Sequence, residues 1–190
     1  IADPNGQLFA SGLFSNMGKV PEFNFEAQLQ NIRLDSLHLT NKYDTPDLSA
    51  ALKANFTGNN IDNLEGDIEI SDLSFKTAQD SFLVKNLDII ASGISSDRHL
   101  NIKSDVLNAE ISGAYSFKTI VPSIMNTFRE YVPALINATQ KNLSAEINNF
   151  SMQLTIENTE RISSTLKLPV TIENQVRLLA HYNNSYNKFR

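Results

Sequence analysis

Residues 100–117 read LNIKSDVLNAEISGAYSF, and the spacing of their apolar side chains decides the fold. Apolar residues recur at every second position, a period typical of a strand with one apolar and one polar face. The stretch therefore predicts two strands, and it raises the question of what their apolar face contacts. The apolar positions are even before residues 107–108 and odd after them: Leu100, Ile102 and Val106, then Ala109, Ile111, Tyr115 and Phe117.

The same alternation continues on both sides of this stretch. Even positions are apolar from Leu48 to Phe56, and residues 58–60, Gly-Asn-Asn, then supply a turn. Further alternating runs occupy residues 68–75, 87–91, 166–172 and 176–180. Within 68–75 the apolar positions change from even to odd at Ser71 and Asp72, so a bulge is needed to keep one face apolar. We predict a mainly β chain of about ten strands, joined by turns as antiparallel neighbours.

Two spaced motifs recur along the chain. The alternative to genuine repetition is chance similarity among amphipathic strands; repetition would mean strands added in series. The first motif is Phe23, Phe25, Ala27, Leu29 and Asn31, repeated as Phe150, Met152, Leu154, Ile156 and Asn158. The second is Leu8, Ala10, Gly12 and Phe14, repeated as Ala109, Ile111, Gly113 and Tyr115, and again as Val176, Leu178, Ala180 and Tyr182.

One segment departs from the period of two. Residues 119–139, TIVPSIMNTFREYVPALINAT, have helical apolar spacing, which predicts a helix over about 119–141. Pro122 suits a first turn, and Pro133 is expected to kink the helix. Arg129 and Glu130 are the charged residues within 119–139, whereas a helix on a membrane surface usually carries more Lys and Arg. Packing of this helix against the sheet is therefore favoured.

The composition excludes several classes of protein. The chain has 190 residues, enough for one domain, and its net charge of −5 without a basic cluster argues against nucleic-acid binding. Its apolar runs fall far short of the roughly 20 residues that span a bilayer. The chain lacks cysteine and begins at Ile1. We expect residues 1–190 to be one β-rich segment of a longer protein, with strands over 1–118 and strands of a following repeat over 145–190.

A search for chemistry in the sequence favours no catalytic or metal site. His38, His99 and His181 are far apart, and none has a second ligand at zinc spacing. Glu65, Asp67 and Glu69 alternate with isoleucines, as the solvent face of a strand does, and with Asp72 they lack the calcium-loop pattern. Phosphate loops, dinucleotide-binding motifs and nucleophile elbows are absent. We therefore predict a protein that is not an enzyme and takes no metal or cofactor.

The stretches GDIEISDLSF (66–75) and LVKNLDIIASG (83–93), followed by the opening stretch, resemble the AsmA/TamB superfamily, particularly the long TamB-like proteins of Gram-negative envelopes. That family has a G-x-I-x-I-x-x-L strand, then strands with L-x-I-x-S-D and a closing I-x-G-x-Y. Ala180 departs from the pattern, because the closing motif has Gly there. The matching positions are Ile68, Ile70, Leu73, Leu100, Ile102, Ser104, Asp105, Ile111, Gly113 and Tyr115.

The resemblance implies a long antiparallel sheet curled into a U-shaped groove that is apolar inside. Family members are linked to phospholipid movement between membranes and, for TamB, to outer-membrane protein assembly. The implied partners are phospholipids or other acyl-chain ligands and outer-membrane assembly proteins. The implied location is the periplasm, with an inner-membrane anchor outside this segment. Candidate lining residues are Ile68, Ile70, Leu73, Phe75, Leu87, Ile89, Leu100, Ile102, Val106, Ile111, Tyr115 and Phe117.

Two further hypotheses stay open on the sequence. One is a structural β-repeat with a packed core that binds envelope proteins. The other is a closed, lipocalin-like carrier, which the recurring motifs make less favourable than a groove. Alternation by itself does not separate a groove from a packed core, because the same apolar face lines the one and fills the other.

Overall fold

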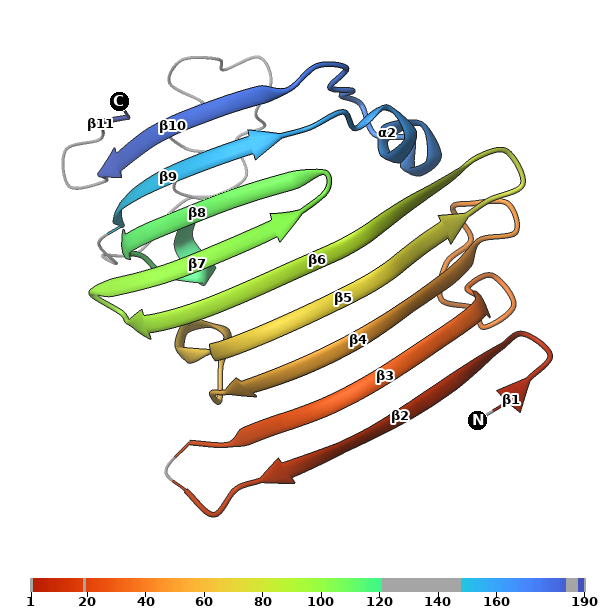
Figure 1. Ribbon diagram of the computed structural model, residues 1–190, viewed down its shortest axis with the longest axis horizontal. Coiled ribbons are helices and arrows are strands. Elements are labelled where there is room, and N and C mark those ends of the chain that lie inside the picture. The colour runs from red at the N-terminus through yellow and green to blue at the C-terminus, as the bar shows by residue number, and fades with distance from the viewer. Residues whose placement is uncertain (1, 19, 121–147, 184–187, 190) are drawn as a thin grey trace.

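A single antiparallel sheet forms the body of the molecule (Figure 1). The computed structural model describes residues 2–18, 20–120, 148–183 and 188–189. Each strand pairs with the next along the chain, so the prediction of a mainly β chain of antiparallel neighbours is confirmed. The strands are β1 (Ala2–Asp3), β2 (Gly6–Ser15), β3 (Glu22–Arg33), β4 (Asp47–Thr57), β5 (Glu65–Lys76), β6 (Ser81–Ile94), β7 (Asp97–Ser104), β8 (Leu107–Ala114), β9 (Asn149–Ile156), β10 (Val176–Asn183) and β11 (Lys188–Phe189).

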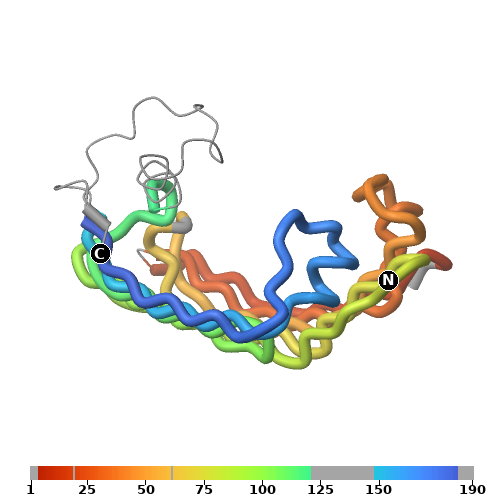
Figure 2. Tube along the Cα trace, turned by 90° about the horizontal axis from the view of Figure 1, so that it is seen from above, coloured from red at the N-terminus to blue at the C-terminus, as the bar shows by residue number. Residues whose placement is uncertain are grey.

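The sheet is curled but does not close on itself. Among the described residues, the long strands β2 and β10 form its two edges, each carrying only a two-residue partner strand. The hypothesis of a closed, lipocalin-like carrier is therefore wrong. Figure 2 shows the strands bent into a U, with residues 34–46 and 117–120 and helix α2 (Glu160–Leu166) on the inner side.

The apolar side chains face the inside of this U. Ile120, which follows β8, packs against Phe150 of β9 and Tyr182 of β10. Near the opposite end of the strands, Tyr43 meets Phe75 of β5 edge to face, with ring centroids 5.4 Å apart. Because both of these covering segments lie on the inner side, the concave face is the apolar one.

Bulges keep the apolar residues on that face where the sequence alternation changes. In β5, Asp72 has a φ of 51°, and the β4–β5 register shifts by one residue between the pairs Ser49–Ser74 and Ala51–Ser71. The bulge expected at residues 71–72 is confirmed. A second bulge, at Asn31 of β3, has the same φ of 51° and is held by a bond from its backbone N–H to Ser49 Oγ (2.9 Å).

The change of the apolar positions from even to odd at residues 107–108 has a different cause, which is a tight hairpin. Ser104 ends β7, and its hydroxyl accepts bonds from the backbone N–H groups of Val106 (3.2 Å) and Leu107 (2.8 Å). The turn pairs Ile102 with Ala109, so an even position in β7 faces the same way as an odd position in β8. A serine among apolar residues therefore marks the turn between the two strands.

The C-terminal part corrects one strand prediction. Residues 166–172 were expected to form a strand, but the structure has α2, which ends at Lys167 with a φ of 53°, followed by irregular chain up to residue 175. Pro169 gives the reason, because proline has no N–H to donate to a sheet. β9 pairs directly with β8, so the C-terminal strands extend the same sheet.

The predicted helix over 119–141, with its kink near Pro133, lies outside the described residues except at its start. Residues 117–120 are helical, and residues 121–147 are not described. Within the described ranges, no helix combines the length and the apolarity needed to cross a bilayer.

Candidate functional site

Cross-strand pairing aligns the concave face into rows that contain one residue from each strand between β2 and β10. Two neighbouring rows, here called the apolar rows, contain no polar side chain. With strands about 4.8 Å apart, each row runs for roughly 38 Å across the sheet. The first apolar row is Gly12, Phe25, Ala54, Ile68, Ile89, Ile102, Ala109, Leu154 and Leu178; the second is Phe14, Phe23, Phe56, Gly66, Ala91, Leu100, Ile111, Met152 and Ala180.

Most of the large side chains in these rows are only half-buried. Ile68, Ile89 and Ile102 in the middle of the first row all keep part of their surface in solvent. At the β2 edge, Phe14 is 62% exposed although it contacts Phe23 at 5.0 Å between ring centroids. A packed core would exclude water from such residues, so the concave face is apolar, and the described part of the chain leaves its middle open.

At one end of the strands the face is closed by a cluster of buried side chains, here called the aromatic cluster: Tyr115, Ile120, Phe150 and Tyr182. The Phe150 ring lies 5.9 Å from that of Tyr115 and 5.4 Å from that of Tyr182. Asp62 of the short helix η1 (Ile61–Asn63) fixes the start of the helical residues 117–120, because its carboxylate accepts a bond from the Phe117 N–H (2.6 Å).

Arg98 of β7 lies on the concave face beside this cluster. Its guanidinium carbon is 5.9 Å from the centroid of the Tyr115 ring and 6.0 Å from that of Phe117, within cation–π range. The residue is 7% exposed, and its Nε has no hydrogen-bond partner among the described residues. Burial raises the pKa of Tyr115 to about 12, while the nearby charge of Arg98 acts in the opposite direction.

The other end of the strands is flanked by residues 34–46 and α2. The Tyr43 hydroxyl donates to the backbone carbonyl of Leu166 at the end of α2 (3.3 Å). Ser164 of the same helix donates to a carboxylate oxygen of Asp80, and this bond is the main cause of a lowered pKa at Asp80. The middle of the concave face therefore lies between two built-up ends.

The structure places the candidate lining residues in three settings. Ile68, Ile89, Ile102, Leu100 and Ile111 belong to the apolar rows, and Ile70 and Leu87 pair next to them. Leu73 and Phe75 follow the Asp72 bulge, with Phe75 buried beneath Tyr43. The remaining three are Val106 in the hairpin turn, Tyr115 in the aromatic cluster and Phe117 packed against that cluster.

Other residues of the concave face were not predicted as lining residues. Phe23, Phe25, Met152 and Leu154 lie in the apolar rows, and their recurring spacing in the sequence was the available signal. Arg98 was also missed. It shares the even positions of Leu100 and Ile102, which is the pattern that places it on the apolar face.

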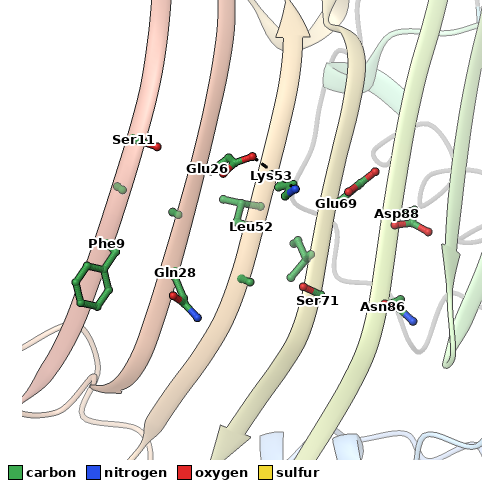
Figure 3. Close-up of a pocket in the computed structure, with 14 residues that line it drawn as sticks. Phe9, Ser11, Glu26, Gln28, Leu52, Lys53, Glu69, Ser71, Asn86 and Asp88 are labelled. Atoms are coloured by element: carbon green, nitrogen blue, oxygen red, sulfur yellow. Dashed lines mark ion pairs between the residues drawn. The ribbon is translucent and has the colours of Figure 1, made fainter.

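The opposite, outer face of the sheet carries most of the charged side chains together with a few exposed apolar ones, such as Phe9 and Leu179. A shallow depression of about 460 Å³ lies there, in which Lys53 pairs with Glu26 at 3.5 Å. Figure 3 shows the residues that line it, with Glu69 across from Asp88. Two further depressions, of about 420 and 490 Å³, are lined mainly by residues of the same face. Charges of both signs line the first depression, whereas glutamates are the charged residues of the other two; all three also have uncharged polar and apolar lining residues.

Acidic and histidine side chains on the outer face are dispersed. Glu65 and Glu69 of β5 are exposed, and Asp67 between them accepts a bond from Asn55 Nδ2 (3.3 Å). His99 lies 3.4 Å from Asp97, and His181 Nδ1 is 3.3 Å from Ser151 Oγ. Within the described part of the chain, no three His, Asp or Glu side chains converge as metal ligands would.

Comparisons with protein-family models, with curated proteins and with solved structures found no match for this chain. The arguments for its function therefore start from the geometry of the concave face.

Proposed function

We propose that this chain is a lipid-shielding segment of a cell-envelope protein of the AsmA/TamB type. The concave face would serve as a groove that holds acyl chains while phospholipids move between membranes, and would in this way support outer-membrane biogenesis. The protein would work in the periplasm of a Gram-negative bacterium, anchored to the inner membrane outside this segment. One observation carries the proposal: two rows without a polar side chain run across the open face of the sheet.

The energetics of acyl-chain transfer suit such a groove. Removing one CH₂ group from water is worth about 0.8 kcal/mol, so a chain of roughly 16 carbons gains about 12 kcal/mol when it leaves water. A lipid that arrives from a bilayer already has this gain, so its transfer into the groove is nearly neutral. The groove can shield the chain without trapping it. This task requires an apolar surface of the right shape and no reacting group, in line with a protein that is not an enzyme.

The second candidate is a structural module that binds envelope proteins and whose apolar face packs internally. The aromatic cluster favours it, because Phe150 and Tyr182 are buried as core residues are. The half-buried isoleucines of the first apolar row favour the groove instead. The two candidates differ in whether the middle of the concave face admits water.

The variant Ile102→Glu tests the proposal at the middle of the first apolar row. In an open groove the carboxylate keeps its water, and we expect a loss of only about 1–2 kcal/mol in the free energy of unfolding. Binding of a fluorescent fatty acid should fall by about tenfold or more, which corresponds to about 1.4 kcal/mol. Urea unfolding and fluorescence titration measure the two quantities. An ionised group in a packed core is severely penalised, so failure of this variant to fold would favour the structural module.

The matched control is Ser112→Glu in β8. Ser112 is exposed on the outer face, and its cross-strand neighbours His99 and Ser151 carry no negative charge. Lys103→Glu is less suitable, because residue 103 lies opposite Asp88 and like charges across strands are destabilising. The control should leave folding and fatty-acid binding nearly unchanged. Equal loss of binding in both variants would contradict a ligand site on the concave face.

A further inference from the structure

Arg98 is a permanently charged side chain placed among apolar and aromatic groups. The guanidinium stays protonated in proteins and presents five N–H donors. Only 7% of the residue is exposed, and its buried Nε finds no hydrogen-bond partner in the part of the chain that the structure describes. Among the described residues, the ion pairs join other side chains, and none brings a carboxylate to Arg98.

Such an arrangement is unfavourable for the protein alone. A buried charge is costly unless it is paired and hydrogen-bonded, and a buried donor without an acceptor adds to that cost. The Tyr115 and Phe117 rings compensate part of it through cation–π contact, but rings do not accept directed bonds as a carboxylate or phosphate does. Unpaired buried polar groups in a native structure therefore call for an explanation such as a missing ligand.

The surroundings of Arg98 indicate what kind of ligand would satisfy it. Its cross-strand neighbours on both sides are glycines, Gly93 and Gly113, so no side chain stands beside it along its row. Two residues further along β7, Leu100 belongs to the second apolar row. A cation and an extended apolar surface thus lie side by side on one face. This is the complement of an amphiphile that has an acyl chain and an anionic head group.

We propose that Arg98 is the head-group receptor of the groove and binds the phosphate or carboxylate of an anionic lipid whose chain lies along the apolar rows. This inference rests on the proposed function and adds the class of lipid. The planar guanidinium suits two parallel bonds to such a group, which a lysine ammonium does not provide.

The experiment compares two probes that differ only in the phosphate, oleoyl lysophosphatidate and monoolein, below their aggregation concentrations. We expect the natural chain to bind lysophosphatidate at least about tenfold more tightly than monoolein. Arg98→Met should remove this preference while affinity for monoolein stays unchanged. Arg98→Lys should keep part of the preference. Lys103→Met removes an exposed cation of the same strand from the outer face and should leave both affinities as they are.

Each other outcome has a defined meaning. The head-group assignment would be overturned if the natural chain bound both probes with equal affinity, or if Arg98→Met kept the preference for lysophosphatidate. Neither result would contradict the proposal that the concave face binds acyl chains. Failure of both probes to bind would overturn the proposed function itself. Inorganic phosphate that binds as tightly as lysophosphatidate would show a site for free anions, against a lipid.

Thermal unfolding separates a ligand-binding role from a structural one. Because Arg98→Met removes a buried charge that has no described partner, the melting temperature should stay the same or rise. Added lysophosphatidate should raise the melting temperature more in the natural chain than in the variant, in which it should act no more strongly than monoolein. A lowered melting temperature together with equal weakening of both probes would assign Arg98 to packing against Tyr115 and Phe117 and would overturn the proposal.

Discussion

Tyr115 shows how its surroundings change the chemistry of a single side chain. The residue is 3% exposed and packs against Phe117 and Phe150, so transfer of its phenolate form from water is disfavoured. Its pKa therefore rises from 10.0 to about 12, although the charge of Arg98 favours the phenolate. The neutral phenol is part of the folded state over the whole physiological pH range.

The raised pKa predicts a loss of stability at alkaline pH. Below pH 10 the Tyr115 phenol is neutral in both the folded and the unfolded chain. Above pH 10 the phenol ionises first in the unfolded chain, which stabilises that state. The contribution of Tyr115 to the free energy of unfolding is therefore lost as the pH rises through about 12. Urea unfolding at a series of pH values should show this fall. In Tyr115→Phe, the part of the alkaline fall in the free energy of unfolding that is due to Tyr115 should disappear. The part that is due to lysines and other tyrosines should persist. An identical alkaline profile in the variant would contradict the assignment.

Arg98 marks the limit of prediction for single residues. The position of Arg98 in the alternating pattern places it on the apolar face, but the pattern carries no information about what lies above it. The rings of Tyr115 and Phe117 reach it only because β8 pairs with β7 and the chain then turns over the concave face. The sequence gives the charge of Arg98 and predicts its place on the apolar face. Only the structure shows that Arg98 is buried and that no described residue forms an ion pair with it.

Among the strands, the bulge in β5 links local backbone geometry to the continuity of the apolar face. Asp72 adopts a left-handed φ of 51°, which costs most L-residues roughly 1–2 kcal/mol but is tolerated by Asp and Asn and is free for Gly. The extra residue lets Leu73 and Phe75 return to the concave face after Ile70. Without it, Phe75 would point to the outer face and lose its contact with Tyr43.

We predict opposite effects for two substitutions at this position. Asp72→Gly should be neutral or slightly stabilising, whereas Asp72→Val should cost about 1–2 kcal/mol, because a β-branched residue is strained at positive φ. Chemical denaturation measures both. As a control, Ser74→Gly in the same strand should cost about 0.5–1 kcal/mol, the usual penalty for glycine in a strand. If Asp72→Gly lowers the free energy of unfolding as much as Ser74→Gly does, the left-handed φ at residue 72 does not decide the effect of substitutions there.

The elements also show where alternation misleads. Residues 166–172 alternate as well as true strands do, yet they form the end of α2 and an irregular segment. The deciding features were Pro169, which cannot donate to a sheet, and the tertiary bond between Tyr43 and Leu166. In contrast, the hairpin at Ser104 follows from local hydrogen bonds. In the sequence it is visible as a change of the apolar positions from even to odd.

For the whole molecule, the prediction concerns the continuity of the groove along the sheet. The chain contains no tryptophan, so single substitutions introduce clean fluorescent reporters. Phe25→Trp in β3 and Leu154→Trp in β9 lie in the same apolar row but near opposite edges of the sheet. If acyl chains occupy the length of the row, a brominated fatty acid should quench both reporters.

Leu179→Trp is the control, because Leu179 is 66% exposed and neighbours Leu178 on the opposite face. Its fluorescence should be insensitive to the same fatty acid at concentrations that quench the other two reporters. Quenching of all three to the same extent would indicate adsorption over the whole surface instead of binding along the concave face.

The sequence alone determined which side chains share a face within each strand, because the two-residue period is a local property of extended backbone. It also determined that the alternation changes at residues 71–72 and 107–108, and hence that a bulge or turn is needed there. The tertiary structure decided how the strands line up, so that apolar residues from β2 to β10 form continuous rows, and that the face they form is concave and left open in its middle by the described residues. It also decided that Arg98 is buried beside the aromatic cluster. These features depend on contacts between residues far apart in the chain, and no local period encodes them.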